Sequence, residues 1–356
     1  MSDLFTTTFG TAPAATDKAP ARANLLGEHT DYNNGFVLPT PLPYFTTVAV
    51  GPGAPGEVEA HAAQFNETLT RRLDAEPNGD WLDYVLGCVR AIKPQGVPVE
   101  GLRVTIESDI PMGAGISSSA ALEVATLRAL RRWLELSIDD EMLARLGQRA
   151  ESGYVGMPCG IMDQMVSSVG RTGAALFLDT LSLDYRHIPL PQSHQLAVVH
   201  SGVAHRLTDG GYRQRRSECE AAAAALNVGS LRALDVDDLP AIEALPEPLN
   251  LRARHVVTEN RRVLDGVAAL ERGDVAAFGR LMVESHRSQR DDYAVSLPEI
   301  DALVKTAMTR GAVGARLTGG GFGGCIIALV PDVAAWWPAV AADHPDAWLV
   351  FPRQGA

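Results

Sequence analysis

The 356-residue chain has few cysteines and no cysteine motif. Its four cysteines are far apart, and no CxxC pair occurs among Cys88, Cys159, Cys219 and Cys325. This spacing argues against a zinc ribbon or a disulfide scaffold, and it is typical of a protein whose thiols stay reduced.

Basic residues are in the minority, and long apolar runs are absent. Lys and Arg number 31 against 43 Asp and Glu, a net charge of −12. Nucleic acid or an anionic membrane would require a broad basic surface. The longest apolar runs, such as 325–330, fall short of the roughly 18 residues that a membrane span needs. Residues 1–13 lack the basic start and apolar stretch of a signal peptide. We expect a cytoplasmic monomer without nucleic-acid or membrane partners.

Hydrophobic residues make up 46% of the chain and charged residues 21%, which excludes extensive disorder. The patterning predicts an α+β fold in two lobes, with a boundary where prolines and polar residues gather after residue 180. The predicted lobes are residues 1–185 and 186–356. Strands are predicted at 36–38, 45–50, 102–106, 174–179, 195–200 and 325–330. Helices are predicted at 118–136, 141–154, 212–225, 254–272, 275–287 and 297–310.

A glycine loop between a predicted strand and a predicted helix has the features of a phosphate cradle. It reads PMGAGISSSAALEVA over residues 111–125. Glycines allow close approach of the backbone, a helix N-terminus favours anions, and serine hydroxyls add donors or Mg²⁺ ligands. A glycine turn with a serine N-cap is the plain alternative. A Walker loop is excluded, because GxxxxGK[ST] is absent.

A second glycine cluster, LTGGGFGGC at 317–325, contains a literal GxGxxG. A dinucleotide fingerprint must open a helix, whereas a strand is predicted to follow here. The cluster therefore favours a loop whose backbone packs tightly against a ligand of another lobe, with a tight β-hairpin as the plain alternative.

Two polar segments are candidates for binding and chemistry. Glu28, His29 and Asp31 lie in RANLLGEHTDY, where their acceptors and donors suit a polyol, although a solvated turn is the plain alternative. No HExxH follows, which argues against metal-dependent hydrolysis. Asp163 lies in the apolar, glycine-containing segment GMPCGIMDQ. A carboxylate there is costly unless partnered, so Asp163 is a candidate base, with a helix N-cap as the alternative.

Together these segments closely resemble the galactokinase family of the GHMP small-molecule kinases. ARANLLGEHTDYNNGFVLP is similar to that family's signature, PMGAGISSSAALEVA to the phosphate motif and GARLTGGGFGGC to the third motif. GMPCGIMDQ, RARHVVTEN, ESHRSQRDDYAVSLPEID and FPRQGA are also similar. The resemblance covers nearly the whole chain in order. It implies an N-terminal lobe like domain 2 of ribosomal protein S5, a ferredoxin-like C-terminal lobe and an active site between them.

The resemblance also implies roles, residue by residue. Arg22 and Asp163 correspond to the catalytic pair, Ser118 or Ser119 with Glu151 to the Mg²⁺ ligands, and Trp81 to the aromatic near adenine. The residues implied to face the sugar are Glu28, His29, Asp31, Gly160, Asp163 and Tyr212. Those implied to wrap the ATP phosphates are Gly113, Ala114, Gly115, Ile116, Ser117, Ser118 and Ser119.

The activity so implied is ATP- and Mg²⁺-dependent phosphorylation of the C1 hydroxyl of α-D-galactose. Two alternatives stand beside it: a kinase for a related sugar such as L-arabinose or N-acetylgalactosamine, and a sugar and ATP sensor without turnover. The complete SSSAA run at 117–121 argues against the sensor, because such relatives lose residues there. A family decarboxylase would need basic residues where Glu28 and Asp31 stand.

Overall fold

The computed structural model describes residues 3–96, 99–203 and 209–353. These residues form two compact units, each built from three segments. The first unit comprises residues 1–22, 41–110 and 117–170, and the second comprises 23–40, 111–116 and 171–356. The predicted division at 185/186 treats each lobe as one continuous segment and stays a prediction.

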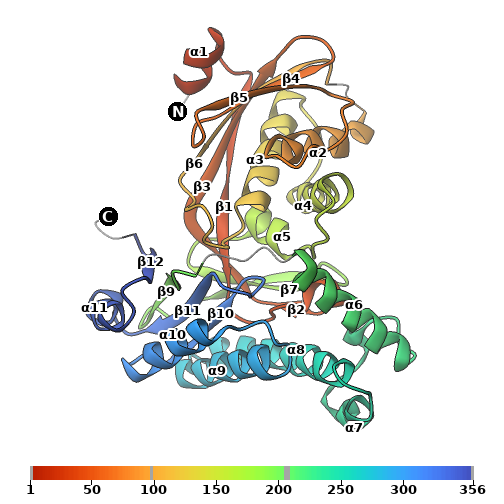
Figure 1. Cartoon of the computed structure of the whole chain (residues 1–356). Helices are drawn as coiled ribbons and strands as arrows, with labels where there is room; N and C mark the ends of the chain where they lie inside the picture. Colours follow the sequence, from red (N-terminus) through yellow and green to blue (C-terminus); the bar gives the residue numbers. More distant parts are fainter. Residues whose placement is uncertain (1–2, 97–98, 204–208, 354–356) are drawn as a thin grey trace. The chain divides into compact units, whose positions relative to one another are not determined.

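The first unit is organised around a five-stranded sheet in the order β1-β3-β6-β4-β5. Helices α2 to α5 cover one face of this sheet (Figure 1). Alternation of apolar and polar residues in LRVTIES makes β6 a central strand, antiparallel to β3 and parallel to β4. The elements are α1 (Asp3–Phe9), β1 (Ala15–Asn24), β3 (Pro39–Pro52), β4 (Glu57–Ala62), β5 (Glu67–Arg72), α2 (Leu82–Ile92), β6 (Leu102–Ser108), α3 (Ser118–Trp133), α4 (Asp140–Arg149) and α5 (Met162–Val169).

The second unit contains a four-stranded sheet, β10-β11-β9-β12, and a three-stranded sheet, β2-β7-β8. The neighbouring strands of the four-stranded sheet all run antiparallel. Its elements are β2 (Phe36–Val37), β7 (Ala174–Asp179), β8 (Tyr185–Pro189), β9 (Gln195–His200), α6 (Asp209–Ala225), α7 (Leu239–Glu243), α8 (Leu249–Glu271), α9 (Val275–Asp291), α10 (Pro298–Thr309), β10 (Gly314–Thr318), β11 (Cys325–Val330), α11 (Val333–Asp343) and β12 (Trp348–Phe351).

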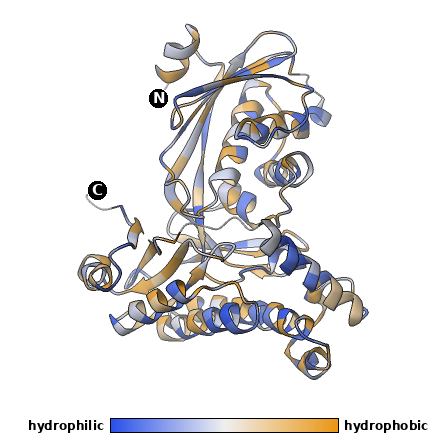
Figure 2. Ribbon diagram, viewed as in Figure 1, coloured by the Kyte–Doolittle hydropathy of each residue, from blue (hydrophilic) through white to orange (hydrophobic). Residues whose placement is uncertain are grey.

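The core of the second unit lies between its four-stranded sheet and its long helices. Every residue of β10 and β11 is buried, whereas α8 and α9 alternate hydrophobic and hydrophilic stretches, as Figure 2 shows. Such alternation is typical of helices that cover one side of a core. Gly266 permits a close approach within α8, because an added Cβ would lie 2.5 Å from Leu26 Cδ1.

The structure confirms the α+β class and the predicted strands at 174–179, 195–200 and 325–330. The helix predicted at 141–154 differs in its second half. The α-helix ends at Arg149, and residues Ala150–Val155 continue as a π-helical turn that contains Glu151. Such wider turns often mark functional positions. None of the helices in the described residues is long and apolar enough to cross a bilayer.

Candidate active site

Arg22 and Asp163 form a two-pronged ion pair within the first unit. Strand β1 supplies Arg22, and the first turn of α5 supplies Asp163. Arg22 Nε donates to Asp163 Oδ1 at 2.7 Å, and a terminal guanidinium nitrogen donates to Oδ2 at 2.7 Å. The Arg22 side chain is 7% exposed and that of Asp163 is 28% exposed. Paired guanidinium bonds hold a carboxylate in one orientation, while its exposed edge stays accessible to a ligand.

Ser117 adds a third hydrogen bond to this carboxylate. Its hydroxyl donates to Asp163 Oδ2. Ser117 occupies the N-cap position of α3 but makes no side-chain capping bond, and the N-cap of α5 is Ile161 rather than Asp163. A serine is thus at the N-cap of α3 without a side-chain capping bond, whereas Asp163 is not an N-cap.

A second group of carboxyls in the first unit lies around Glu151. Gln164 Nε2 donates to Glu151 Oε2 at 2.6 Å and to Glu123 Oε2 at 2.9 Å. Burial raises the pKa of Glu151, the charge of Asp163 adds to that rise, and a hydrogen bond with Ser119 opposes it. Burial raises the pKa of Glu123 well above its usual range, and the charge of Glu151 adds to this rise.

The donor set around Glu151 fits a divalent cation that retains water and phosphate ligands. The Glu151 carboxylate and the Ser119 hydroxyl are hydrogen-bonded, so two hard oxygen donors are adjacent. Mg²⁺ usually takes one or two protein carboxylates together with substrate phosphates and water. Within residues 3–96, 99–203 and 209–353, no three His, Cys, Asp or Glu side chains form a complete metal cage. Ser118, the other predicted ligand, is exposed at the start of α3.

The predicted phosphate loop has a backbone that alternates into the left-handed region. Gly113, Gly115 and Ser117 have φ values of 72°, 68° and 65°. Alternation of this kind turns successive amide groups toward one side, and the first-turn amides of α3 follow directly. The backbone of this loop can therefore bind an anion, and its role toward phosphates stays a prediction.

The second glycine cluster connects two antiparallel strands, β10 and β11, which confirms the hairpin and excludes a dinucleotide fingerprint. It also packs against the phosphate loop within the second unit. An added Cβ on Gly319 would lie 3.2 Å from the Gly115 carbonyl oxygen, and the Cys325 thiol donates to the Ala114 carbonyl at 3.0 Å. The hairpin therefore supports the loop from one side.

The predicted sugar-facing residues of the second unit lie among aromatic rings and one buried ion pair. Arg316, which is fully buried, donates to Glu28 Oε2 at 2.6 Å. The His29 ring lies 5.6 Å from the Tyr212 ring, between ring centroids. Burial lowers the pKa of His29 to about 3, helped by His255 and Arg215, so this imidazole is neutral. Asp31 is half-buried, and its backbone carbonyl accepts from Thr180 Oγ1 at 3.1 Å.

The structure thus brings together Arg22, Asp163 and Ser117, pairs Ser119 with Glu151, and places His29 beside Tyr212. Gly160 is buried three residues before Asp163. Trp81 precedes α2 and donates from Nε1 to Glu67 Oε2 at 2.7 Å. Its predicted place at adenine stays a prediction, as do the roles of the other residues.

Several supporting residues escaped the sequence reasoning: Glu123, Gln164, Tyr32, Tyr293, His255 and Arg316. Tyr293, His255 and Arg316 lie in motifs that resemble the family, but the motifs gave them no role. Glu123 carried a signal of its own, since it is the sole acidic residue of helix α3, whose sequence is SSAALEVATLRALRRW. A buried acid in an apolar helix face needs a specific partner.

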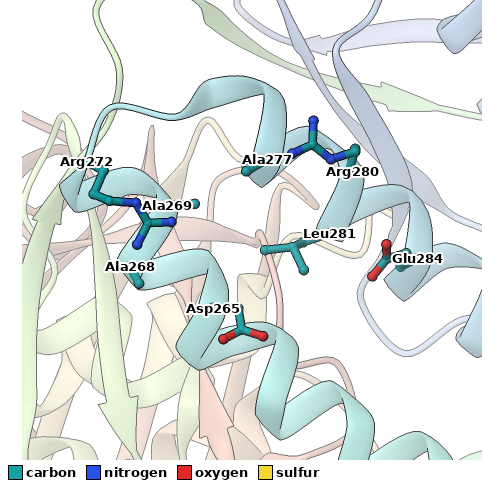
Figure 3. A pocket seen from close by; sticks show the side chains of 8 residues that line it. All are labelled: Asp265, Ala268, Ala269, Arg272, Ala277, Arg280, Leu281 and Glu284. Carbon is teal, nitrogen blue, oxygen red and sulfur yellow. The ribbon is translucent and has the colours of Figure 1, made fainter.

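A separate cavity of about 240 Å³ lies on the surface between α8 and α9 (Figure 3). Its charged lining residues are Asp265, Arg272, Arg280 and Glu284, around Leu281. The lining mixes both charge signs and contains none of the predicted site residues, so this cavity is not the candidate active site.

Comparisons with known proteins agree over the whole chain. The model of the galactokinase galactose-binding signature matches residues 3–52, that of the GHMP kinase N-terminal domain residues 83–171, and that of the GHMP kinase C-terminal domain residues 267–335. A galactokinase from Roseiflexus sp. (strain RS-1) is 47% identical over 93% of this chain and 87% of its own length. A galactokinase from Streptomyces coelicolor is 44% identical over 99% of this chain and 94% of its own length.

Solved structures give the same family. A crystal structure of Lactococcus lactis galactokinase complexed with galactose matches with a TM-score of 0.91 and 30% identity, covering 98% of this chain and 96% of that one. The Methanococcus jannaschii mevalonate kinase matches with a TM-score of 0.70 and 18% identity, over 94% and 96%. At that identity the second match shows the shared fold alone.

Proposed function

This chain belongs to the galactokinase family of the GHMP kinases, and on that basis we propose that it phosphorylates α-D-galactose at C1 with ATP. The products are galactose 1-phosphate and ADP, and Asp163 is the catalytic carboxylate. The observation that carries the proposal is the fixed carboxylate of Asp163, held by Arg22 and by Ser117 at the start of α3.

The reaction needs positioning and charge neutralisation more than covalent chemistry by the protein. The C1 oxygen forms a bond to the γ-phosphorus as the bond from that phosphorus to the ADP oxygen breaks. Asp163 accepts the C1 proton, or orients that hydroxyl if the transition state is largely dissociative. Arg22 fixes the Asp163 carboxylate and stabilises negative charge that builds on the transferring group.

Residues of the phosphate loop and α3 hold ATP in this proposal. Gly113–Ile116 present backbone amides to the phosphates, and the chain runs directly on into Ser117. Ser119 and Glu151 are the proposed Mg²⁺ ligands, because their oxygens are adjacent. When bound, Mg²⁺ supplies positive charge to the β- and γ-phosphates. We propose that the protein is a monomer, as expected from the sequence, and analytical ultracentrifugation of the purified protein tests this.

The sugar contacts are proposed for Glu28, His29, Asp31, Gly160, Asp163 and Tyr212. A neutral imidazole and fixed carboxylates discriminate hydroxyl configuration, because an inverted hydroxyl leaves buried groups unpaired at roughly 1–3 kcal/mol each. Arg22 lies six residues before Glu28, so one stretch of chain carries both a proposed catalytic group and a proposed sugar-facing group.

The first test is ADP release from a panel of galactose, glucose, N-acetylgalactosamine and L-arabinose, with the product position read by ³¹P coupling to the anomeric proton. Galactose is expected to give the highest kcat/KM, well above glucose. Equal turnover of galactose and glucose would remove the galactose assignment, and a preference for another panel sugar would establish the related-sugar kinase.

The second test is Asp163→Asn, with Asp140→Asn as the matched control. Both aspartates lie in the first turn of a helix and pair with an arginine, Asp140 with Arg131 at 2.9 Å. Asp163→Asn should lower kcat roughly 10²–10⁴-fold while ATP binding is retained. Asp140→Asn should leave kcat within twofold. Near-normal turnover of Asp163→Asn would exclude Asp163 as the catalytic carboxylate.

A further inference from the structure

A hydrogen-bonded row of side chains extends behind His29 in the second unit. His29 Nδ1 lies 2.9 Å from the Tyr32 hydroxyl, and that hydroxyl lies 2.7 Å from the Tyr293 hydroxyl. Tyr293 Oη lies 3.1 Å from the Cys219 sulfur, which also takes a side-chain hydrogen bond from Asn33. Tyr293 and Cys219 are buried, and no role in the proposed reaction has been given to either.

The other ring nitrogen of His29 is buried and makes no hydrogen bond within the described residues. The imidazole is neutral because burial lowers its pKa to about 3, so it carries one proton, at either Nδ1 or Nε2. Which nitrogen holds the proton is set by the hydrogen bond that the other nitrogen makes. The direction in which the hydroxyls of the row donate therefore decides whether Nε2 of His29 is a donor or an acceptor.

The count of donors and acceptors along the row favours one direction. If the row runs from sulfur to imidazole, Cys219 donates to Tyr293, Tyr293 to Tyr32, and Tyr32 to the His29 Nδ1 lone pair. Every hydrogen then has an acceptor, and the phenol faces imidazole nitrogen, a stronger acceptor than sulfur. In the reverse direction the Cys219 sulfur accepts from both Asn33 and Tyr293, and its own hydrogen has no acceptor among these groups.

The count of donors and acceptors therefore places the proton on Nε2, with the Nδ1 lone pair accepting from Tyr32.

We propose that Cys219, Tyr293 and Tyr32 hold His29 as the Nε2–H tautomer, so that His29 is a hydrogen-bond donor toward a sugar oxygen, and Tyr293 is a positioning residue for that donor. This inference rests on the proposed function for the identity of the ligand as a sugar, but the tautomer itself is a property of the chain without any ligand. The contacted sugar group must then act as an acceptor.

The test reads the tautomer directly in the full chain, without sugar or ATP. Long-range ¹H–¹⁵N correlation spectra of protein with ¹⁵N-labelled histidine distinguish the two tautomers by their nitrogen shifts, and His29→Gln identifies the resonances of His29. Wild type should show a single Nε2–H pattern. An Nδ1–H pattern, or an even mixture, would overturn the proposal.

Variants distinguish a hydrogen-bonding role of the row from a role in packing alone. Tyr293→Phe keeps the ring and removes the hydroxyl, so the His29 spectrum should become a mixture of tautomers. Cys219→Ala should shift it in the same direction, whereas Cys219→Ser retains a donor and should keep the wild-type pattern. A His29 spectrum unchanged in both Tyr293→Phe and Cys219→Ala would exclude a role for the row.

Kinetics provide the second readout. Tyr293→Phe should raise the KM for galactose about five- to tenfold, with the KM for ATP unchanged. Equal increases in both constants would indicate general disruption and contradict a positioning role. If the chain turned over no galactose at all, the proposed function would fail, while the spectrum of wild type would still decide the tautomer.

Discussion

Two buried glutamates of the first unit and two of the second have different neighbours, although buried Asp83 of the first unit also pairs with an arginine, Arg71. In the first unit, Glu123 and Glu151 are buried, and neither forms an ion pair with Lys or Arg within the described residues. In the second unit, Arg316 contacts Glu28 at 2.6 Å and Arg262 contacts Glu259 at 2.7 Å. Burial alone would raise the pKa of Glu259, but Arg262 and Arg316 lower it to about 2.

The difference teaches that neighbours rather than burial decide the charge of these carboxyls. Carboxyls without a protein cation are suited to a cation that arrives with a ligand, which fits Glu151 beside Ser119. Carboxylates already neutralised by arginine keep fixed acceptor atoms, which suits recognition of hydroxyls. We therefore interpret Glu151 of the first unit as a metal-binding carboxyl, and Glu28 of the second unit, paired with Arg316, as a sugar-recognition group.

The largest effect should come from removal of Arg316, the buried arginine that pairs with Glu28 in the second unit. Arg316→Met removes the arginine that pairs with buried Glu28, and Glu259 loses part of its compensating charge. Breaking a buried pair in this way costs about 3–5 kcal/mol. Urea denaturation at pH 7 measures the loss.

The matched control is Arg261→Met, which breaks an exposed pair with Asp265 on the same unit. This pair is mostly solvated, so the expected cost is roughly 0–1 kcal/mol. Equal stability of the two variants would show that the buried pair does not hold the second unit together.

A smaller effect concerns the pH dependence of stability in the first unit. Glu123 keeps its proton in the folded chain at pH values where the unfolded chain releases it, because burial raises its pKa. The unfolded state then binds fewer protons, so this group makes stability fall as pH rises above 4.5, by at most about 1.4 kcal/mol per pH unit.

Glu123→Gln removes this proton and retains an acceptor for Gln164, so its stability should fall less than that of wild type between pH 5 and 8. Urea midpoints at each pH measure the slope. Glu141→Gln, an exposed position on α4, serves as the control and should keep the wild-type slope. A Glu123→Gln slope equal to that of wild type would mean that Glu123 is ionised in the folded chain.

The smallest effect separates the two serines of the predicted metal site. Ser119→Ala should raise the Mg²⁺ concentration for half-maximal turnover roughly tenfold, because a hard oxygen ligand is lost while others remain. Ser152→Ala, beside Glu151 but bonded to the Gln148 carbonyl, should leave it unchanged. A shift confined to Ser118→Ala would transfer the ligand role to Ser118.

The sequence allowed prediction of the fold class, three strands at their observed bounds and the partnership of Asp163 with Arg22. It did not predict that Gln164 donates to two carboxyl groups, or that Tyr293 contacts the tyrosine that is hydrogen-bonded to His29. Local patterns such as helical spacing identify elements, whereas these contacts join residues far apart in the chain. Glu123 and Gln164 are 41 positions apart, and Tyr32 and Tyr293 are 261 positions apart. The π-helical turn at Ala150–Val155 was not predicted either, because the helical pattern continues into it through Ala150 and Glu151 before Ser152 and Gly153 weaken it.

The most direct measurement compares one carboxyl from each unit in Mg²⁺ and galactose titrations of turnover. Glu151→Gln should raise the Mg²⁺ requirement about tenfold and leave the KM for galactose within twofold. Asp31→Asn should raise the KM for galactose about tenfold and leave the Mg²⁺ requirement unchanged. Circular dichroism and urea midpoints confirm that both variants are folded. If both variants shifted the same constant, the division between Glu151 as a metal ligand and Asp31 as a sugar-recognition group would be contradicted.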